Sequence, residues 1–399
     1  MRCLSLLNPG RLPVARLAFR PLFLLAALFS VVSMGIWLAF WHGDILLNPY
    51  GGLMFWHQHE MLFGFSTAVV SGFLLTAVQN WTGLPSLKGL PLLALVALWL
   101  FARVLLAFPM DLPPWLIAAL DLIFLPLVAL VVTRLVIAVR RWRNLIFLPV
   151  LGLLMLANLA MHVGAIRGDA LLVQDGAYLT VLLISLLMVV LGGRVIPMFT
   201  TNRLGLRPRA TLRWLELLSL GSVMAVVLVQ LLNLLGGELP KALQASVMGL
   251  AAICNMARLL RWDGYHCWRE PLLWGLHISY AFIPLGLAMW GLALSGVLRT
   301  ELAVHALTVG GMSTMMLAMM ARVSLGHTGR CIRTLPGIGV ALALMVAAAL
   351  LRAPILALVP EITHWIYTIS ILFWCLAYLI FLAHYTRPLM VARVDGRDG

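Results

Sequence analysis

Acidic residues are scarce in this 399-residue chain, which has 14 Asp and Glu against 28 Lys and Arg. Calcium and magnesium are bound mainly by carboxylate and other oxygen ligands, so we expect no cage for such hard cations. Charged residues make up only 11% of the chain and hydrophobic residues 63%, whereas soluble domains are nearer half apolar. An ordinary soluble domain is therefore excluded.

Cysteine is also scarce, and its five copies form neither a CxxC pair nor a zinc-ligand spacing. Structural disulfides are therefore not expected, and the lack of CxxCH excludes covalent c-type haem. The sequence has no P-loop, no GxSxG and no dinucleotide-binding glycine motif. No cleavable signal is evident either, because the first apolar run is too long and lacks a small-residue cleavage site.

Long apolar runs dominate what remains, and a transmembrane helix needs about 20 such residues. Twelve spans are predicted on this basis: 21–41, 58–80, 89–108, 114–138, 144–164, 171–198, 212–235, 240–260, 271–294, 300–322, 337–357 and 363–385. We predict an all-α, polytopic membrane bundle that forms a single transmembrane domain over residues 1–399. An N-terminal segment, 1–20, precedes spans that cover about 21–385, and a tail, 386–399, follows them.

The net charge of +14 is spread over short loops between the apolar runs. No basic stripe on a soluble domain exists, so the expected partner is the lipid bilayer and not nucleic acid. Basic residues gather in every second connection, as Lys88 in one and as arginines at 2–20, 140–143, 203–213, 258–269, 322–333 and 387–397. The positive-inside rule then places both termini in the cytoplasm.

Histidines inside such a bundle are candidates for function, because ionisable groups are costly in a membrane and imidazole is the commonest metal ligand. The predicted topology brings five of them to the outer third of the bundle: His57, His59, His162, His305 and His364. Of those on the cytoplasmic half, only His277 lies well inside a span. The outer group therefore predicts a metal centre.

The second span carries a polar mouth above a face of small residues. His57, Glu60, Gly64, Ala68, Gly72 and Thr76 follow one another at spacings of three or four. This face suits either a close packing seam between helices or a flat slot for a porphyrin. His59 is two residues from His57, so a regular helix cannot point both side chains at one metal.

Other polar residues also face the predicted cavity. His305 shares a helix face with Met312 and Met319, which suits flexible gap-filling or soft Cu(I) ligation. Asn158 and His162 are four residues apart, so we expect Asn158 to orient the imidazole.

Two further groups have both structural and functional interpretations. Arg103 and Asp121 are expected at similar depth on adjacent spans, as a buried ion pair or part of a proton path. The stretch Gly192–Pro197 is expected to loosen its helix beside Arg194, whose side chain either reaches the interface or binds an anion such as a haem propionate.

Several motifs together resemble the NnrS family. They are His57-x-His59-Glu60-Met61-Leu62-Phe63-Gly64-Phe65, Asn80-Trp81-Thr82-Gly83, Gly192-Gly193-Arg194-Val195-Ile196-Pro197, Leu276-His277, and the run from His305-Ala306-Leu307-Thr308-Val309-Gly310 to Gly326-His327-Thr328-Gly329-Arg330. The match follows nearly the whole chain in order and spacing. It implies a bacterial inner-membrane protein of about twelve spans that carries haem and copper and protects against nitric oxide and nitrosative stress, commonly alongside denitrification.

The resemblance also carries residues into the expected site. Those inside matching motifs are His57, His59, Glu60, His277, His305 and His327, and His162 follows as a further metal ligand. We expect His57, His59 and His305 to be ligands of the outer centre, with Glu60 behind them or as a proton donor. His277 is expected to bind a non-covalent b-type haem from the cytoplasmic side, with Arg194 as another cofactor-binding residue. His327 is expected in a cytoplasmic loop, in a structural or anion-binding role.

Two classes of function fit these expectations. One is an oxidoreductase that reduces nitric oxide to nitrous oxide with electrons from membrane quinol or another donor. The alternative is non-enzymatic, either a nitric oxide sensor or scavenger, or a transporter of metal or a small ligand. Nitrous oxide formed in proportion to nitric oxide consumed separates the two.

Overall fold

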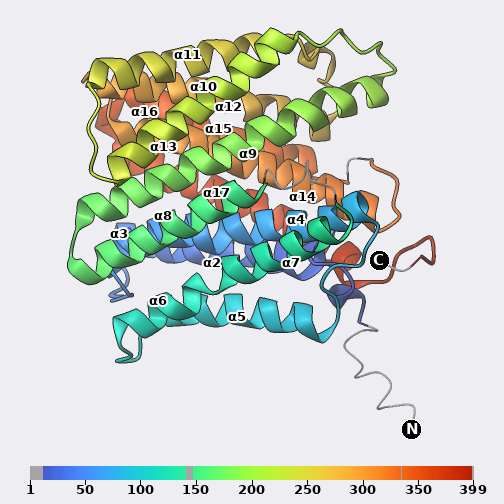
Figure 1. The fold of residues 1–399 in the computed structure, drawn as a ribbon, viewed down its shortest axis with the longest axis horizontal. Helices are drawn as coiled ribbons and strands as arrows, with labels where there is room; N and C mark the ends of the chain where they lie inside the picture. Colours follow the sequence, from blue (N-terminus) through green and yellow to red (C-terminus); the bar gives the residue numbers. More distant parts are fainter. Residues whose placement is uncertain (1–11, 141–146, 334, 398–399) are drawn as a thin grey trace. The chain divides into compact units, whose positions relative to one another are not determined.

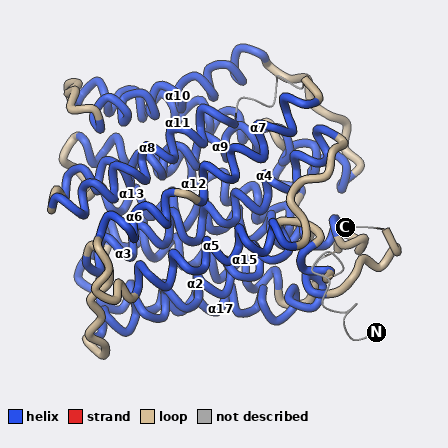
Figure 2. The backbone as a smooth tube through the Cα atoms, turned by 60° about the horizontal axis from the view of Figure 1, so that its bottom comes forward, coloured by secondary structure: helices blue, strands red, loops and turns tan. Residues whose placement is uncertain are grey.

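The computed structural model describes residues 12–140, 147–333 and 335–397. Within these ranges the chain is helical and contains no β-strand, as Figure 2 shows. Twelve of the described helical segments are long and apolar enough to cross a membrane. The predicted all-α, polytopic fold is therefore confirmed, and the chain is a multi-pass membrane protein. The cytoplasmic location of both termini stays a prediction. The arginines at 2–11 and 141–143, which contribute to this prediction, lie outside the described residues.

Helix bounds follow the hydropathy pattern closely (Figure 1). The spans are built from α2 (Phe19–His42), α3 (Gly52–His59) with α4 (Thr67–Thr82), α5 (Leu90–Ala107), α6 (Pro114–Leu122) with α7 (Phe124–Ala138), α8 (Phe147–Arg167), α9 (Ala170–Leu204), α10 (Arg213–Leu234), α11 (Lys241–Leu259), α12 (Pro271–Leu294), α13 (Thr300–His305) with α14 (Thr314–His327), α15 (Ile338–Leu350) with α16 (Leu356–Leu358), and α17 (Thr363–Met390). Short 3₁₀ helices lie at Pro13–Ala15, Gly264–His266 and Pro360–Ile362.

The chain divides into two compact units. Unit 1 comprises Met1–Ala177, Met320–Arg333 and Phe381–Gly399, and unit 2 comprises Tyr178–Met319 and Thr334–Ile380. Within unit 1, α6 packs against both α5 and α8, and α4 packs against α2 and α7. Within unit 2, α12 is central, because it packs against α11, α13 and α15. The prediction of a single domain stays a prediction.

Three spans contain π-helical segments, which the sequence did not predict: η3 (Glu60–Ser66), η6 (Ala306–Ser313) and η7 (Leu351–Ile355). The first two each follow a histidine and end before a threonine. Their serines donate to carbonyls five residues back, Ser66 to Met61 at 2.8 Å and Ser313 to Thr308 at 3.0 Å. These bonds satisfy carbonyls in the widened turns, where π-helices commonly mark functional sites.

The η3 segment changes which side chains share a face on the second span. A regular α-helix was expected from His57 to Thr76, and this expectation is wrong between Glu60 and Ser66. A π turn holds more residues than an α turn, so side chains beyond it are rotated relative to those before it. His59, the last residue of α3, is buried as a result of this local geometry and its packing, whereas His57 is half-buried.

The stretch Gly192–Pro197, expected to loosen its helix, lies within α9, which continues through Pro197 to Leu204, and the loosening stays a prediction. Proline removes one backbone hydrogen bond, and the helix retains the others. The role of glycine here is steric: a Cβ atom at Gly193 would overlap the guanidinium of Arg258, which donates to the Val189 carbonyl at 2.9 Å. Gly193 therefore lets a buried arginine reach the backbone of α9.

Candidate metal centre

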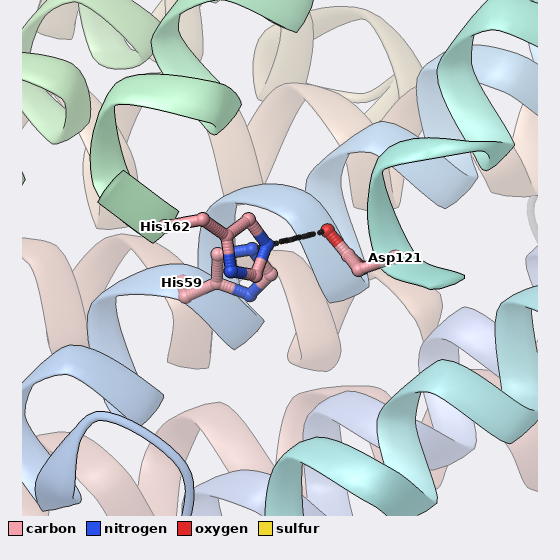
Figure 3. A group of neighbouring side chains, drawn as sticks. All are labelled: His59, Asp121 and His162. Carbon is pink, nitrogen blue, oxygen red and sulfur yellow. Dashed lines mark hydrogen bonds and ion pairs between the residues drawn. The ribbon is translucent and has the colours of Figure 1, made fainter. Parts of the chain in front are cut away.

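Three side chains from three spans converge within unit 1 (Figure 3). His59, Asp121 and His162 each offer one ligand atom, and the three atoms lie within 4.8 Å of one another. The Nε2 atoms of His59 and His162 are 3.3 and 3.1 Å from Asp121 Oδ2. All three residues are buried, with exposed fractions of 4% or less. The arrangement is therefore a pre-formed group of donor atoms inside the helical bundle.

Each donor is placed by a distinct local feature. His59 ends α3 immediately before the π turn, and Asp121 lies one residue from the end of α6. The span breaks there, between α6 and α7, and Pro126 has no N–H to donate to the Leu122 carbonyl. Asn158 and His162 are one turn apart on α8 and project from the same face. His59 and Asp121 therefore lie at helix interruptions, and His162 lies on a regular helix.

Both ring nitrogens of His59 face acceptor oxygens. Its Nδ1 lies 3.0 Å from Glu60 Oε1, and its Nε2 lies 2.9 Å from Asn158 Oδ1 as well as near Asp121 Oδ2. These three oxygens act as acceptors when the carboxylates are ionised, but a neutral imidazole has one N–H to donate. One ring nitrogen therefore directs a lone pair at other lone pairs unless a proton or metal ion lies between them. A metal ion at Nε2 resolves this conflict.

The hydrogen-bond partners of His162 allow either of its ring nitrogens to carry the proton. Its Nε2 faces Asp121 Oδ2, and its Nδ1 lies 3.2 Å from the hydroxyl of Tyr50. Burial raises the pKa of Tyr50 to about 12, so the hydroxyl stays protonated. A tyrosine hydroxyl both donates and accepts, so it can pair with Nδ1 whether or not Nε2 carries the proton. Such a partner orients a ligating imidazole.

Arg103 supplies the positive charge behind the donor group. Its Nη1 donates to Glu60 Oε1 at 2.7 Å, and its Nη2 bonds to Asp121 Oδ1. The predicted buried ion pair between Arg103 and Asp121 is therefore confirmed. Because Arg103 takes Oδ1, Oδ2 of the same carboxylate is the oxygen that faces the histidines. One arginine against two carboxylates leaves the buried cluster with a net charge of −1 when both carboxylates are ionised.

The donor atoms fit a single metal ion. Ligand atoms 2.0–2.1 Å from a tetrahedral ion are separated by about 3.3 Å, close to the spacings around Asp121 Oδ2. Imidazole and carboxylate ligands suit copper, zinc or non-haem iron. A haem iron, by contrast, has four porphyrin ligands and accepts protein ligands only on its two opposite faces. The cluster of His59, Asp121 and His162 therefore suits a single copper, zinc or non-haem iron ion better than a haem iron.

Gly64 makes room for the charged cluster, which gives a testable expectation. A Cβ atom at this position would lie 2.7 Å from Phe29 Cε1 and 3.1 Å from both Arg103 Nη1 and Glu60 Oε2. We expect Gly64→Ala to lower the free energy of unfolding by about 1–3 kcal/mol through overpacking. Gly152, which has open space around it, is the matched control. Gly152→Ala is expected to be neutral or stabilising by about 1 kcal/mol. Equal effects in thermal unfolding would contradict the assigned role of Gly64.

His57 and His305, two predicted ligands of the outer centre, contact residues outside this group of donors. The ring of His57 stacks on Trp37, with centroids 4.1 Å apart and planes at 15°. His305 belongs to unit 2, where its Nδ1 donates to the Glu301 carbonyl at 2.6 Å. The neutral ring of His305 therefore carries its lone pair on Nε2, the form that binds metals. The roles predicted for His57 and His305 stay predictions.

His277 makes contacts typical of a structural histidine. Thr200 donates its hydroxyl proton to the Ile196 carbonyl and accepts from His277 Nε2 at 2.9 Å. The lone pair of a neutral ring is then on Nδ1, where the backbone of Gly264 lies so close that a Cβ atom there would clash. These contacts favour a packing role, and the predicted haem ligation is untested.

The last two predicted residues, His327 and Arg194, lie on α14 and α9. His327 is the final residue of α14, so its predicted location in a loop is wrong. Its ring packs on Phe19 with centroids 5.6 Å apart, and its carbonyl accepts from Arg393 at 2.9 Å. Arg194 is exposed on α9. The cofactor and metal roles of both residues stay predictions.

The contacts of Asp121, Asn158 and Tyr50 with the two histidines differ from what the sequence predicted or were not predicted at all. Asp121 was expected to pair with Arg103 or to belong to a proton path, and Asn158 was expected to orient His162. Asn158 instead contacts His59 and donates its amide to Asp121 Oδ2 at 2.8 Å. Tyr50 lies outside every predicted span and carried no signal. The predicted pair of Arg103 and Asp121 was the sequence feature closest to this site. Arg103 bonds to Oδ1 of Asp121, and Oδ2 faces the two histidines.

The fold and the cluster define a class: a multi-pass helical membrane protein with a buried histidine–carboxylate group able to hold a metal ion. The model of the NnrS protein family matches residues 13–393, nearly the whole chain. The chain therefore belongs to the NnrS family, as its motifs predicted. A comparison with curated proteins gives no match. Family membership fits a membrane protein related to nitric oxide, and the donor group suggests a metal cofactor.

Proposed function

We propose that this protein binds copper through His59, Asp121 and His162 and reduces nitric oxide to nitrous oxide. The observation that carries the proposal is the convergence of His59 Nε2, His162 Nε2 and Asp121 Oδ2, three possible ligand atoms within 4.8 Å of one another. Bound copper would supply a one-electron couple and, by expanding its coordination number, a position for a small ligand. The bacterial inner membrane is the proposed location, and membrane quinol or another donor the proposed electron source.

The surrounding side chains perform the tasks that such a site needs. Glu60 fixes the ring of His59 through Nδ1, and Tyr50 fixes that of His162. Glu60 Oε2 is buried and has no hydrogen-bond partner among the described residues. This oxygen is the proposed proton-holding atom, because reduction of two nitric oxide molecules consumes two protons and two electrons and releases nitrous oxide and water. Arg103 limits the repulsion between the two carboxylates.

Non-covalent b-type haem is the second proposed cofactor, and His305 is its best-supported ligand. His305 precedes η6 as His59 precedes η3, so both spans place a histidine directly before a π turn. The hydrogen bond from Nδ1 to the Glu301 carbonyl places the lone pair of a neutral ring on Nε2, which supports a ligand role for this nitrogen. Haem at this position would supply an electron-transfer or ligand-binding iron.

The reaction is tested by supplying nitric oxide to the purified, copper-loaded protein with a quinol. We expect one nitrous oxide for every two nitric oxide molecules consumed, and a loss of at least about 100-fold in rate for His59→Ala, as for removal of a metal ligand. Binding of nitric oxide without nitrous oxide would favour a sensor or scavenger. Copper uptake into proteoliposomes, without an effect of nitric oxide, would favour transport.

A further inference from the structure

Asn158 holds an unusual position within the donor group. Its side chain is 3% exposed, and its amide nitrogen donates to Asp121 Oδ2 at 2.8 Å. This bond fixes the orientation of the amide, because the reversed group would place an oxygen against the carboxylate. Oδ1 must then point at His59 Nε2, 2.9 Å away. In the absence of a metal ion, Oδ1 accepts the Nε2–H bond of His59, and it would face an ion that replaced this proton.

The other donors leave one coordination position to fill. Asp121 contributes only Oδ2, since Arg103 is bonded to Oδ1. Two imidazole nitrogens and one carboxylate oxygen make three ligands, and a four-coordinate ion needs one more. Amide carbonyl oxygens bind metal ions, and Asn158 Oδ1 already lies beside His59 Nε2.

We propose that Asn158 Oδ1 is the fourth ligand of the ion, and that the neutral amide biases the site toward the lower charge state of copper. This inference rests on the proposed metal centre. It assigns a ligand and a tuning role to a residue that the histidine and carboxylate cluster does not include.

The bias follows from the charge of the buried residues. Glu60, Arg103 and Asp121 together carry −1, and each is 4% exposed or less. An uncompensated charge is costly where water is excluded, so the ion that neutralises the cluster is favoured. Cu(I) makes the total zero, whereas Cu(II) leaves +1 unless an anion also binds. A carboxylate in place of the amide would reverse this preference.

The experiment compares Asn158→Asp and Asn158→Ala in the full-length protein, loaded with copper in detergent or nanodiscs. We expect N158D to retain one copper per chain and to raise the ratio of Cu(II) to Cu(I) affinity by about tenfold or more, measured as a lower reduction potential. We expect N158A to weaken binding of both oxidation states by about 10–100-fold in chelator competition.

Asn255 provides the matched control, because it is also fully buried and hydrogen-bonded. Its amide donates to the Ala251 carbonyl, and its oxygen accepts from Tyr280, both within unit 2. Asn255→Ala should leave copper affinity and potential unchanged. Loss of copper from N158D to the same extent as from N158A would overturn the inference, since the amide would then act only as a donor to Asp121. Wild-type protein that binds no copper would instead overturn the metal centre itself, and this inference with it.

Discussion

Substitution of His59 by alanine is expected to lower copper affinity by more than about 100-fold, and substitution of His162 or Asp121 should do the same. The three donor atoms lie within 4.8 Å of one another, so one ion can bind all three. Loss of any one of them leaves too few ligands for a four-coordinate ion. Copper per chain in purified protein and competition with a chelator measure the effect. Retention of full copper in any of the three variants would contradict the ligand assignment.

His57 offers a control from the same helix. Its ring stacks on Trp37 and lies outside the group of converging donor atoms. We therefore expect His57→Ala to keep its copper. His305→Ala should also keep copper, and should lose the haem spectrum if the haem ligand is assigned correctly. Copper loss in His57→Ala with retention in His162→Ala would favour the ligand set expected from the sequence alone.

Substitution of Arg103 by glutamine is expected to lower the free energy of unfolding by about 3–5 kcal/mol in the metal-free protein. Removal of the guanidinium leaves Glu60 and Asp121 as buried carboxylates without a compensating charge. Thermal or denaturant unfolding in detergent measures the loss. The double variant Arg103→Gln with Asp121→Asn should recover part of it, because one of the two carboxylates is then neutral.

The ion pair of Arg299 and Glu301 is the matched control for Arg103. Its atoms are 3.1 Å apart, but both side chains are about half exposed. An exposed pair contributes little, so Arg299→Gln should change stability by less than about 1 kcal/mol. Equal losses of stability in Arg103→Gln and Arg299→Gln would contradict the expectation that the buried ion pairs of Arg103 contribute more than the exposed pair.

Hydropathy predicted the spans well because a bilayer sets a minimum apolar length, and twelve runs meet it. It could not predict where the helices depart from α geometry. The π turns after His59 and His305 depend on tertiary contacts, such as the bond from Trp99 Nε1 to the Gly64 carbonyl at 3.0 Å. Similar elements recur in both segments, a histidine, a glycine and a final serine, but this pattern became meaningful only with the structure.

The candidate site was predictable in part. Depth placed His59 and His162 on one side of the membrane, because spacing from the helix ends fixes how far along a span a residue lies. Which helices are neighbours is not encoded in hydropathy, so His57 and His305 were grouped with them on depth alone. Asp121 was correctly paired with Arg103, yet its second oxygen gained a role only when α6 was seen to pack against α8.

The most direct test of the central claim is the X-ray absorption spectrum of copper in the fully loaded wild-type protein. We predict a first shell of nitrogen and oxygen alone at about 2.0 Å, with the outer-shell signal of two imidazoles. His162→Ala should retain little copper, and what remains should show the signal of a single imidazole. A sulfur ligand at about 2.3 Å, or copper with more than two imidazoles, would contradict a centre built from His59, Asp121 and His162.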